Sequence, residues 1–107
     1  MRRGDIVAVT VPGDFGKPRP ALIIQADRFD TTGTVALLLL TSAVDEPTFL
    51  RVNVTPTALN GLRRPSQVMV DKIYSVPRAK VGGAIGAIES DVLLQVTRSL
   101  AIFVGLA

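Results

Sequence analysis

The sequence predicts one domain that is mainly β, with a single C-terminal α-helix. Short runs rich in Val, Ile and Leu recur between residues 6 and 88, and turns containing Gly or Pro separate them. A helical period appears only after Ser90. The chain has 107 residues, 48% of them hydrophobic, so it can bury a core of its own. We therefore expect one domain over residues 1–107, built as a small, highly curved sheet or partly open barrel.

The predicted strands follow the apolar runs. The first run ends at Pro12-Gly13, and Pro20 opens the second because its fixed φ suits the first residue of a strand. The third run is apolar on both faces, which is typical of a central, buried strand. The fourth run alternates and directs Arg51 and Asn53 outward. The predicted strands are 6–11, 21–25, 34–41, 50–55, 66–70 with a continuation over 72–76, and 84–88.

The remaining segments are turns and the terminal helix. Segment 56–62 is compatible with one helical turn, and a turn is expected over residues 80–83. Ser90 is a typical N-cap, and the helix that follows is expected to reach about Val104, with Gly105 just after its end. Helical spacing predicts that its buried face consists of Leu93, Val96, Leu100 and Phe103.

Composition excludes several kinds of chemistry. The chain contains no Cys and no His, which removes disulfides, thiolate nucleophiles and every mechanism based on imidazole. Its carboxylates are scattered, and its glycines match no nucleotide-binding pattern, so no metal and no cofactor is expected. The longest central apolar run is too short to span a membrane, and Arg2-Arg3 precedes no signal-peptide core. We therefore expect a cytoplasmic protein whose reactive groups are carboxylates, hydroxyls, Lys and Arg.

The most unusual segment is G-D-F-G-K-P-R-P, residues 13–20, which places Lys17 and Arg19 just before a buried strand. The planar fork of an arginine matches the oxygens of a phosphate, and an anchor at a strand end would hold that fork still. The alternative is structural, because Arg19 could instead pair with Asp5 or Asp27 and fix the loop. The net charge of +3 is compatible with a polyanionic partner but does not establish one.

Three further groups are candidates. Thr41 and Ser42 end the central strand, where two hydroxyls can bind a phosphate or, more commonly, cap a turn. Asp71 follows the apolar run 68–70, and it could form a strand-end ion pair with Lys72 or Arg78. The remaining candidates are the adjacent Arg63 and Arg64, which are most simply a solvated loop.

Together these segments resemble the MazF/PemK/Kid family of toxins over nearly the whole chain. The resemblance rests on the order and spacing of four motifs and the closing helix. The motifs are R-G-D-I-V at 3–7, K-P-R-P-A-L-I-I-Q at 17–25, L-T-S at 40–42, and N-G-L with P-S-x-V-M-V-D-K-I within 60–73. Kid-like members carry a second arginine where this chain has Met69, and some members have a histidine in the first loop.

The resemblance implies a fold, an activity and partners. The fold would be an SH3-like, strongly curved antiparallel barrel of the PemK/CcdB type. The protein would act as a homodimer that cuts single-stranded RNA at short motifs, and a cognate antitoxin would restrain it. The 2′-hydroxyl of the RNA would attack the adjacent phosphorus and leave 2′,3′-cyclic phosphate and 5′-hydroxyl ends without a metal. Arg19 would stabilise the phosphorane charge, Thr41 would bind a nonbridging oxygen, and Asp71 would be the carboxylate nominated as base.

The RNA contacts expected around these residues are phosphate binding and base stacking. Phe15 is the best candidate for stacking a base, with Tyr74 next. The predicted phosphate contacts are Lys17, Ser42, Arg63, Arg64 and Lys72. An acidic, extended antitoxin segment would compete for the same groove. Two alternatives stay open: a barrel that binds RNA or antitoxin without cutting, and a gyrase poison like CcdB, which the absence of any Trp disfavours.

Overall fold

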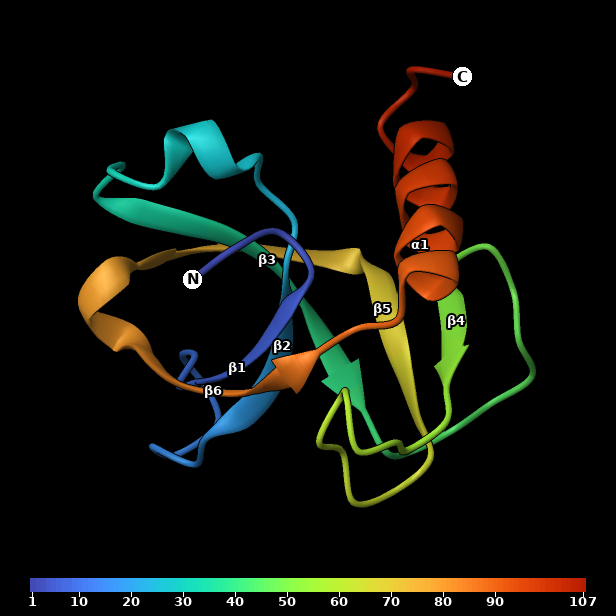
Figure 1. Ribbon diagram of the computed structural model, residues 1–107, viewed down its shortest axis with the longest axis horizontal. Helices are drawn as coiled ribbons and strands as arrows, with labels where there is room; N and C mark the ends of the chain where they lie inside the picture. The colour runs from blue at the N-terminus through green and yellow to red at the C-terminus, as the bar shows by residue number, and fades with distance from the viewer.

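The computed structural model describes residues 1–107 as six strands, two short 3₁₀ turns and one helix (Figure 1). The strands are β1 Asp5–Val9, β2 Arg19–Ile23, β3 Thr34–Thr41, β4 Arg51–Val54, β5 Ser66–Pro77 and β6 Val81–Ala87. The 3₁₀ turns are η1 Asp27–Phe29 and η2 Arg78–Lys80, and the helix is α1 Ser90–Phe103. No helix is long and apolar enough to cross a membrane.

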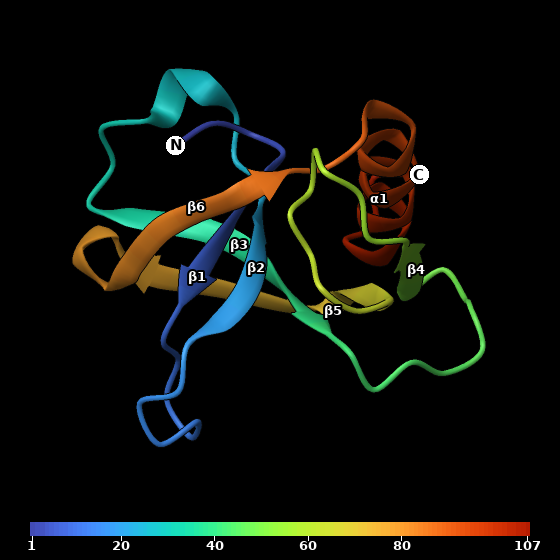
Figure 2. The same ribbon diagram turned by 60° about the horizontal axis from the view of Figure 1, so that its bottom comes forward.

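The six strands form one antiparallel sheet in the order β4-β5-β3-β2-β1-β6. The sheet is strongly bent, so that β1, β2 and β6 turn away from β4 and the helix (Figures 1 and 2). β4 and β6 remain two separate edges, so the strands do not close into a full barrel. The mainly β fold with a C-terminal helix is therefore confirmed, whereas the closure of an SH3-like barrel is not.

The two faces of the bent sheet bury two separate apolar cores. α1 packs against β4 and β5 and covers the first face, and the curl of the sheet encloses the second (Figure 2). The first core includes Ile6, Leu22, Leu38, Leu40, Val52, Val68, Val70 and Val96. The second includes Val9, Ala21, Ile23, Val35, Leu37, Leu39 and Met69. β3 contributes to both cores, as expected for a central strand that is apolar on both faces.

Segment 56–62 makes the single helical turn that the sequence allows: Gly61 N–H donates to the Thr57 carbonyl (3.0 Å), and the side chains of Thr57 and Asn60 bond to each other's backbone N–H groups. Two other local predictions, the turn over residues 80–83 and the inward position of Phe103, were wrong. The turn expected over residues 80–83 is made earlier by η2, and β6 already begins at Val81. Phe103 is 45% exposed, whereas Val96 is buried and Leu93 and Leu100 pack on the first core. The buried face of the helix therefore ends near Leu100, one turn before Phe103, and it includes Val92 and the buried Ser99.

The loop after β4 docks tightly on the edge strand β6. Gly86 passes so close that a Cβ there would lie 2.5 Å from the carbonyl oxygen of Asn60. Ala87 N–H donates to the carbonyl of Leu59 (3.0 Å), and the Asn60 side chain donates to a carboxylate oxygen of Glu89 (3.0 Å). These contacts fasten the start of the helix to the loop that leads towards Ser66 and β5.

Candidate active site

The loop between β1 and β2 presents its polar residues through a tightly kinked backbone. Gly13 and Gly16 have positive φ, and Phe15 between them also has a φ of 54°, which is uncommon for a residue with a Cβ. Lys17 N–H donates to the carbonyl of Asp14 (2.9 Å) and closes the turn. Pro18 and Pro20 then favour an extended chain on either side of Arg19, the first residue of β2.

The ends of β2 and β3 meet beside this loop and line an open surface cavity of about 300 Å³. Ala21 pairs with Leu39 in the β2–β3 ladder, so continuing the same register brings Arg19 opposite Thr41. The cavity is lined by Asp14, Lys17, Pro18, Arg19, Pro20, Leu40, Thr41, Ser42 and Ser66. The predicted residues Arg19, Thr41, Lys17 and Ser42 are thus brought together in one place.

Arg19 is held from two sides but keeps donors free. One Nη donates to the carbonyl oxygen of Leu40 (3.3 Å), and Nε lies 3.6 Å from an Oδ of Asp14. That Asp14 oxygen is buried and has no hydrogen-bond partner. Arg19 therefore pairs with Asp14, and not with Asp5 or Asp27, the two alternatives that the sequence suggested.

Thr41 both caps a turn and faces the cavity. Its hydroxyl oxygen accepts a hydrogen bond from Ala43 N–H (3.1 Å) and donates to no protein group. The hydroxyl hydrogen is therefore available to a ligand in the cavity, so the capping role and the binding role that the sequence left open are compatible.

Asp71 does not line this cavity. Its carboxylate forms an ion pair with Arg51 of the neighbouring strand β4, and not with Lys72 or Arg78. The hydrogen bond from Arg51 lowers the pKa of Asp71 below its ordinary value. The carboxylate that the structure places beside Arg19 and Thr41 is Asp14.

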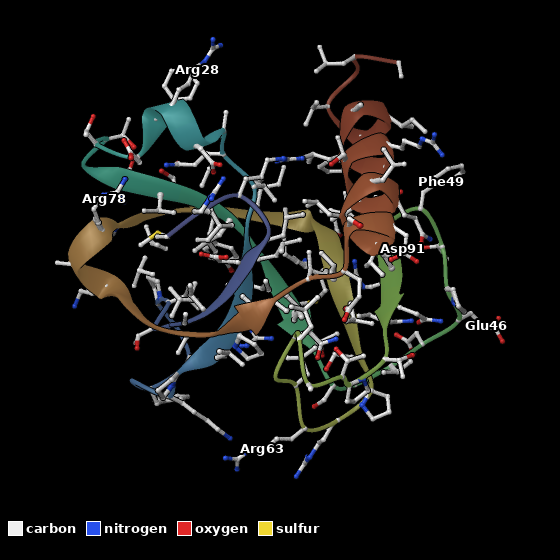
Figure 3. The ribbon with its side chains drawn as sticks, viewed as in Figure 1. Arg28, Glu46, Phe49, Arg63, Arg78 and Asp91 are labelled. Atoms are coloured by element: carbon white, nitrogen blue, oxygen red, sulfur yellow. The ribbon has the colours of Figure 1, made fainter.

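The other predicted RNA contacts are spread over neighbouring surfaces. Arg63, Arg64 and Lys72 are exposed and do not line the cavity, and Arg63 extends outward from the loop before β5 (Figure 3). Phe15 is fully exposed. It lines a second cavity of about 700 Å³ together with Tyr74 and Lys80.

Sequence reasoning did not select three residues that the structure brings to this region: Asp14, Ser66 and Arg51. Asp14 lies in the same Gly-rich loop as Lys17 and Arg19, so its place in that loop was the available signal. Ser66 and Arg51 carry no such signal, because only the register of β5 against β3 and β4 brings them near. The structure contains no group of three or more His, Cys, Asp or Glu side chains able to hold a metal ion.

Comparisons with known proteins show the family to which the chain belongs. Residues 2–104 match the family described as PemK-like, MazF-like toxin of type II toxin–antitoxin system. A protein of Mycolicibacterium smegmatis named probable endoribonuclease MazF is 39% identical over 108 residues, which span 100% of this chain and 99% of that protein.

Solved structures share the fold. A mycobacterial endoribonuclease in complex with its cognate antitoxin superposes with a TM-score of 0.84 at 20% identity, covering 100% of this chain and 97% of that one. The Mycobacterium tuberculosis toxin MazF-mt6 gives 0.81 at 23% identity, with 96% and 98% covered. MazF in a MazE–MazF structure from Deinococcus radiodurans gives 0.80 at 24% identity, with 100% and 97% covered. The family match and the full-length relative show that this chain is a member of the PemK-like, MazF-like family of type II toxin–antitoxin toxins.

Proposed function

We propose that this toxin is an endoribonuclease that cuts single-stranded RNA at short sequence motifs without a metal ion. The observation that carries the proposal is the convergence of Arg19, Thr41 and Asp14 on one cavity at the ends of β2 and β3. The full-length relative named as an endoribonuclease supports it. Residues 1–107 act as one catalytic domain in the cytoplasm.

The RNA supplies its own nucleophile in this reaction. The 2′-oxygen forms a bond to the adjacent phosphorus, and the bond from that phosphorus to the 5′-oxygen of the next nucleotide breaks. The 2′-hydroxyl proton passes to a carboxylate, and the leaving 5′-oxygen takes a proton from water. The products are a 2′,3′-cyclic phosphate and a 5′-hydroxyl.

Arg19 and Thr41 act on the phosphorus centre. The guanidinium donors that Leu40 and Asp14 leave free stabilise the charge that accumulates on the nonbridging oxygens of the transition state. Thr41 donates its free hydroxyl hydrogen to one of these oxygens. Both groups are set by strand ends, so they need little reorganisation when RNA binds.

Two carboxylates could act as the general base, Asp14 and the sequence-predicted Asp71. Asp14 lines the cavity beside Arg19, and its side chain is 25% exposed, so its carboxylate can accept a proton there. Asp71 is engaged by Arg51, and its lowered pKa makes it a weaker proton acceptor. The geometry favours Asp14, and the two are separable by substitution.

The surrounding residues bind the rest of the strand and the partners. Lys17, Ser42, Arg63, Arg64 and Lys72 contact phosphates, and Phe15 stacks on a base. The toxin assembles as a homodimer, and its cognate antitoxin restrains it by laying an acidic, extended segment over the same cationic surface. Relatives solved in complex with an antitoxin support this partner.

The test is the chemistry of the RNA ends. Purified protein is incubated with a long RNA in EDTA, and the fragments are mapped and their termini identified. Discrete fragments with 2′,3′-cyclic phosphate and 5′-hydroxyl ends are expected. RNA that is bound with salt-dependent affinity but stays intact would replace the nuclease with a binding module.

A further inference from the structure

The face of the sheet that carries the cavity holds a second arginine–aspartate pair, Arg51 with Asp71. Thr41 pairs with Gln67, and Gln67 pairs with Asn53, and directly paired residues point to the same face of a sheet. Arg51 lies two residues before Asn53 on β4 and therefore shares that face. Val52 and Val54 between and beyond them point to the opposite face, into the core under α1.

Arg51 is fixed in place but keeps most of its donors. A single nitrogen, Nη1, donates both to an Oδ of Asp71 and to the carbonyl oxygen of Leu50 (2.8 Å). Nε and Nη2 donate to no protein group. The side chains of Arg51 and Asp71 are 24% and 25% exposed, so solvent and ligands reach them. The Arg51 guanidinium is held in place through Nη1, and its free Nε and Nη2 form a planar fork of donors that matches phosphate oxygens.

The spacing suits two phosphates of one strand. Arg51 lies two strands from Thr41 and two residues farther along the sheet, which corresponds to roughly 12 Å between their Cα atoms at ordinary strand spacing and rise. Arg51 also lies directly across from Met69 of β5, on the face of the sheet that carries the cavity.

We infer that Arg51 is an RNA-binding residue that holds a phosphate other than the one being cut, and that Asp71 positions Arg51. The inference rests on the proposed RNA substrate and deepens it. Asp71 acts on the guanidinium rather than on the 2′-hydroxyl, in keeping with its engagement by Arg51 and its distance from the cavity lining.

The experiment scans the RNA backbone against the arginine. Single methylphosphonates, which remove the charge of one phosphate, are placed along a short RNA that carries the cleavage motif and a 2′-deoxy sugar at the cut. Affinities for wild type and Arg51→Ala are then measured by fluorescence anisotropy. One phosphate away from the cut is expected to weaken wild-type binding about tenfold and to have no effect on Arg51→Ala. The slope of log affinity against log salt should fall by about 0.7 in that variant.

The controls separate binding from folding and from the general base. Arg2→Ala is the matched control for Arg51→Ala, because it removes one positive charge from another arginine–aspartate pair, the exposed Arg2–Asp27 pair. In this control each methylphosphonate should weaken RNA binding by the same factor as in wild type. Arg51→Lys keeps the charge without the fork and should restore binding only in part. Asp71→Asn should weaken binding at the same phosphate while the pH profile of kcat keeps its shape. Thermal unfolding and light scattering confirm that the variants retain their fold and assembly.

The inference is overturned if every methylphosphonate penalty of wild type persists in Arg51→Ala. It is also overturned if Asp71→Asn leaves binding intact and abolishes the acid limb of the kcat profile, which would make Asp71 the base. Failure of the proposed function looks different, because wild type would then leave the unmodified RNA uncut.

Discussion

Replacing Asp14 by Asn tests the assignment of the general base. The substitution keeps the shape of the side chain and removes its ability to accept a proton. Asp14 lines the cavity beside Arg19, and its only charged partner there is the 3.6 Å contact with the Arg19 Nε. A positioned general base contributes about 10²- to 10⁴-fold to a rate. At 1.36 kcal/mol for each factor of ten, that is about 3 to 5 kcal/mol of transition-state stabilisation.

The effect should fall on kcat and not on KM, because removing a negative charge does not weaken the binding of an anionic RNA. Stability should change by about 1 kcal/mol or less, since the Arg19–Asp14 pair is partly exposed and 3.6 Å long. The assay is single-turnover cleavage of a fluorogenic RNA in EDTA, and the cleavage rate should fall about 10²-fold or more in Asp14→Asn.

Asp30→Asn is the matched control, because Asp30 is an exposed carboxylate in the turn after η1. It should retain wild-type rates. Wild-type or faster kcat in Asp14→Asn would refute the reasoning and would reduce Asp14 to a contact that the substrate displaces from Arg19. Loss of kcat in Asp71→Asn alone would transfer the role of base to Asp71.

Three further outcomes are expected. Thr41→Val should lower kcat about 10- to 100-fold with little change in KM, because the lost hydroxyl donates only to the transition state. Single-turnover and multiple-turnover rates on one RNA measure the change in kcat. Asn60→Ala should lower the free energy of unfolding in urea by about 2 to 4 kcal/mol, because the Asn60 side chain is fully buried and forms four hydrogen bonds. Its partners are the N–H groups of Thr57 and Leu62, the Thr55 carbonyl and the Glu89 carboxylate. An unchanged urea midpoint would contradict this prediction. A hydrogen bond from Arg51 lowers the pKa of Asp71, and hydrogen bonds from Thr57 and Asn60 lower the pKa of Glu89. The stability that these two carboxylates contribute is complete above the ordinary carboxyl range near pH 4 and is lost as the pH falls through their lower folded-state pKa values. The urea midpoint should therefore fall from pH 7 to 5 to 3, and Asp71→Asn should reduce that fall.

The sequence predicts a strand or a site residue correctly where the pattern that indicates it lies within a few neighbouring residues. β3 has the bounds that its apolar run predicts, because a strand buried on both faces needs an uninterrupted apolar sequence. Arg19 and Thr41 could be selected because each stands at the end of such a run, next to a proline or a second hydroxyl. Their convergence follows from one antiparallel pairing, that of β2 with β3.

The Arg51–Asp71 pair could not be predicted, because it depends on register. Arg51 and Asp71 are 20 residues apart, and only the pairing of Arg51 with Met69 brings their side chains together. A shift of one residue would point Arg51 into the opposite face, and the alternation of one strand does not specify its partner. The bulge in the β3–β5 ladder between Leu38 and Leu40 adds an offset that no local pattern reveals.

The start of the helix shows a similar limit. The sequence predicts Ser90 as the N-cap, but Ser90 is the first helical residue and Glu89 occupies the cap position without bonding the helix. The Glu89 carboxylate accepts instead from the Thr57 hydroxyl (2.6 Å) and from the Asn60 side chain (3.0 Å). A tertiary contact to a distant loop therefore replaces the local cap that propensity favours.

The most direct measurement compares RNA cleavage by wild type and Arg19→Ala in EDTA, with Arg28→Ala as control. Arg28 is exposed and stacks over Phe29, away from the cavity, so its loss matches the change in charge. We predict that Arg19→Ala is slower by about 10²-fold or more, while Arg28→Ala cleaves like wild type at the same positions. Equal rates for wild type and Arg19→Ala, or cleavage by wild type that stops in EDTA, would contradict a metal-independent reaction centred on Arg19.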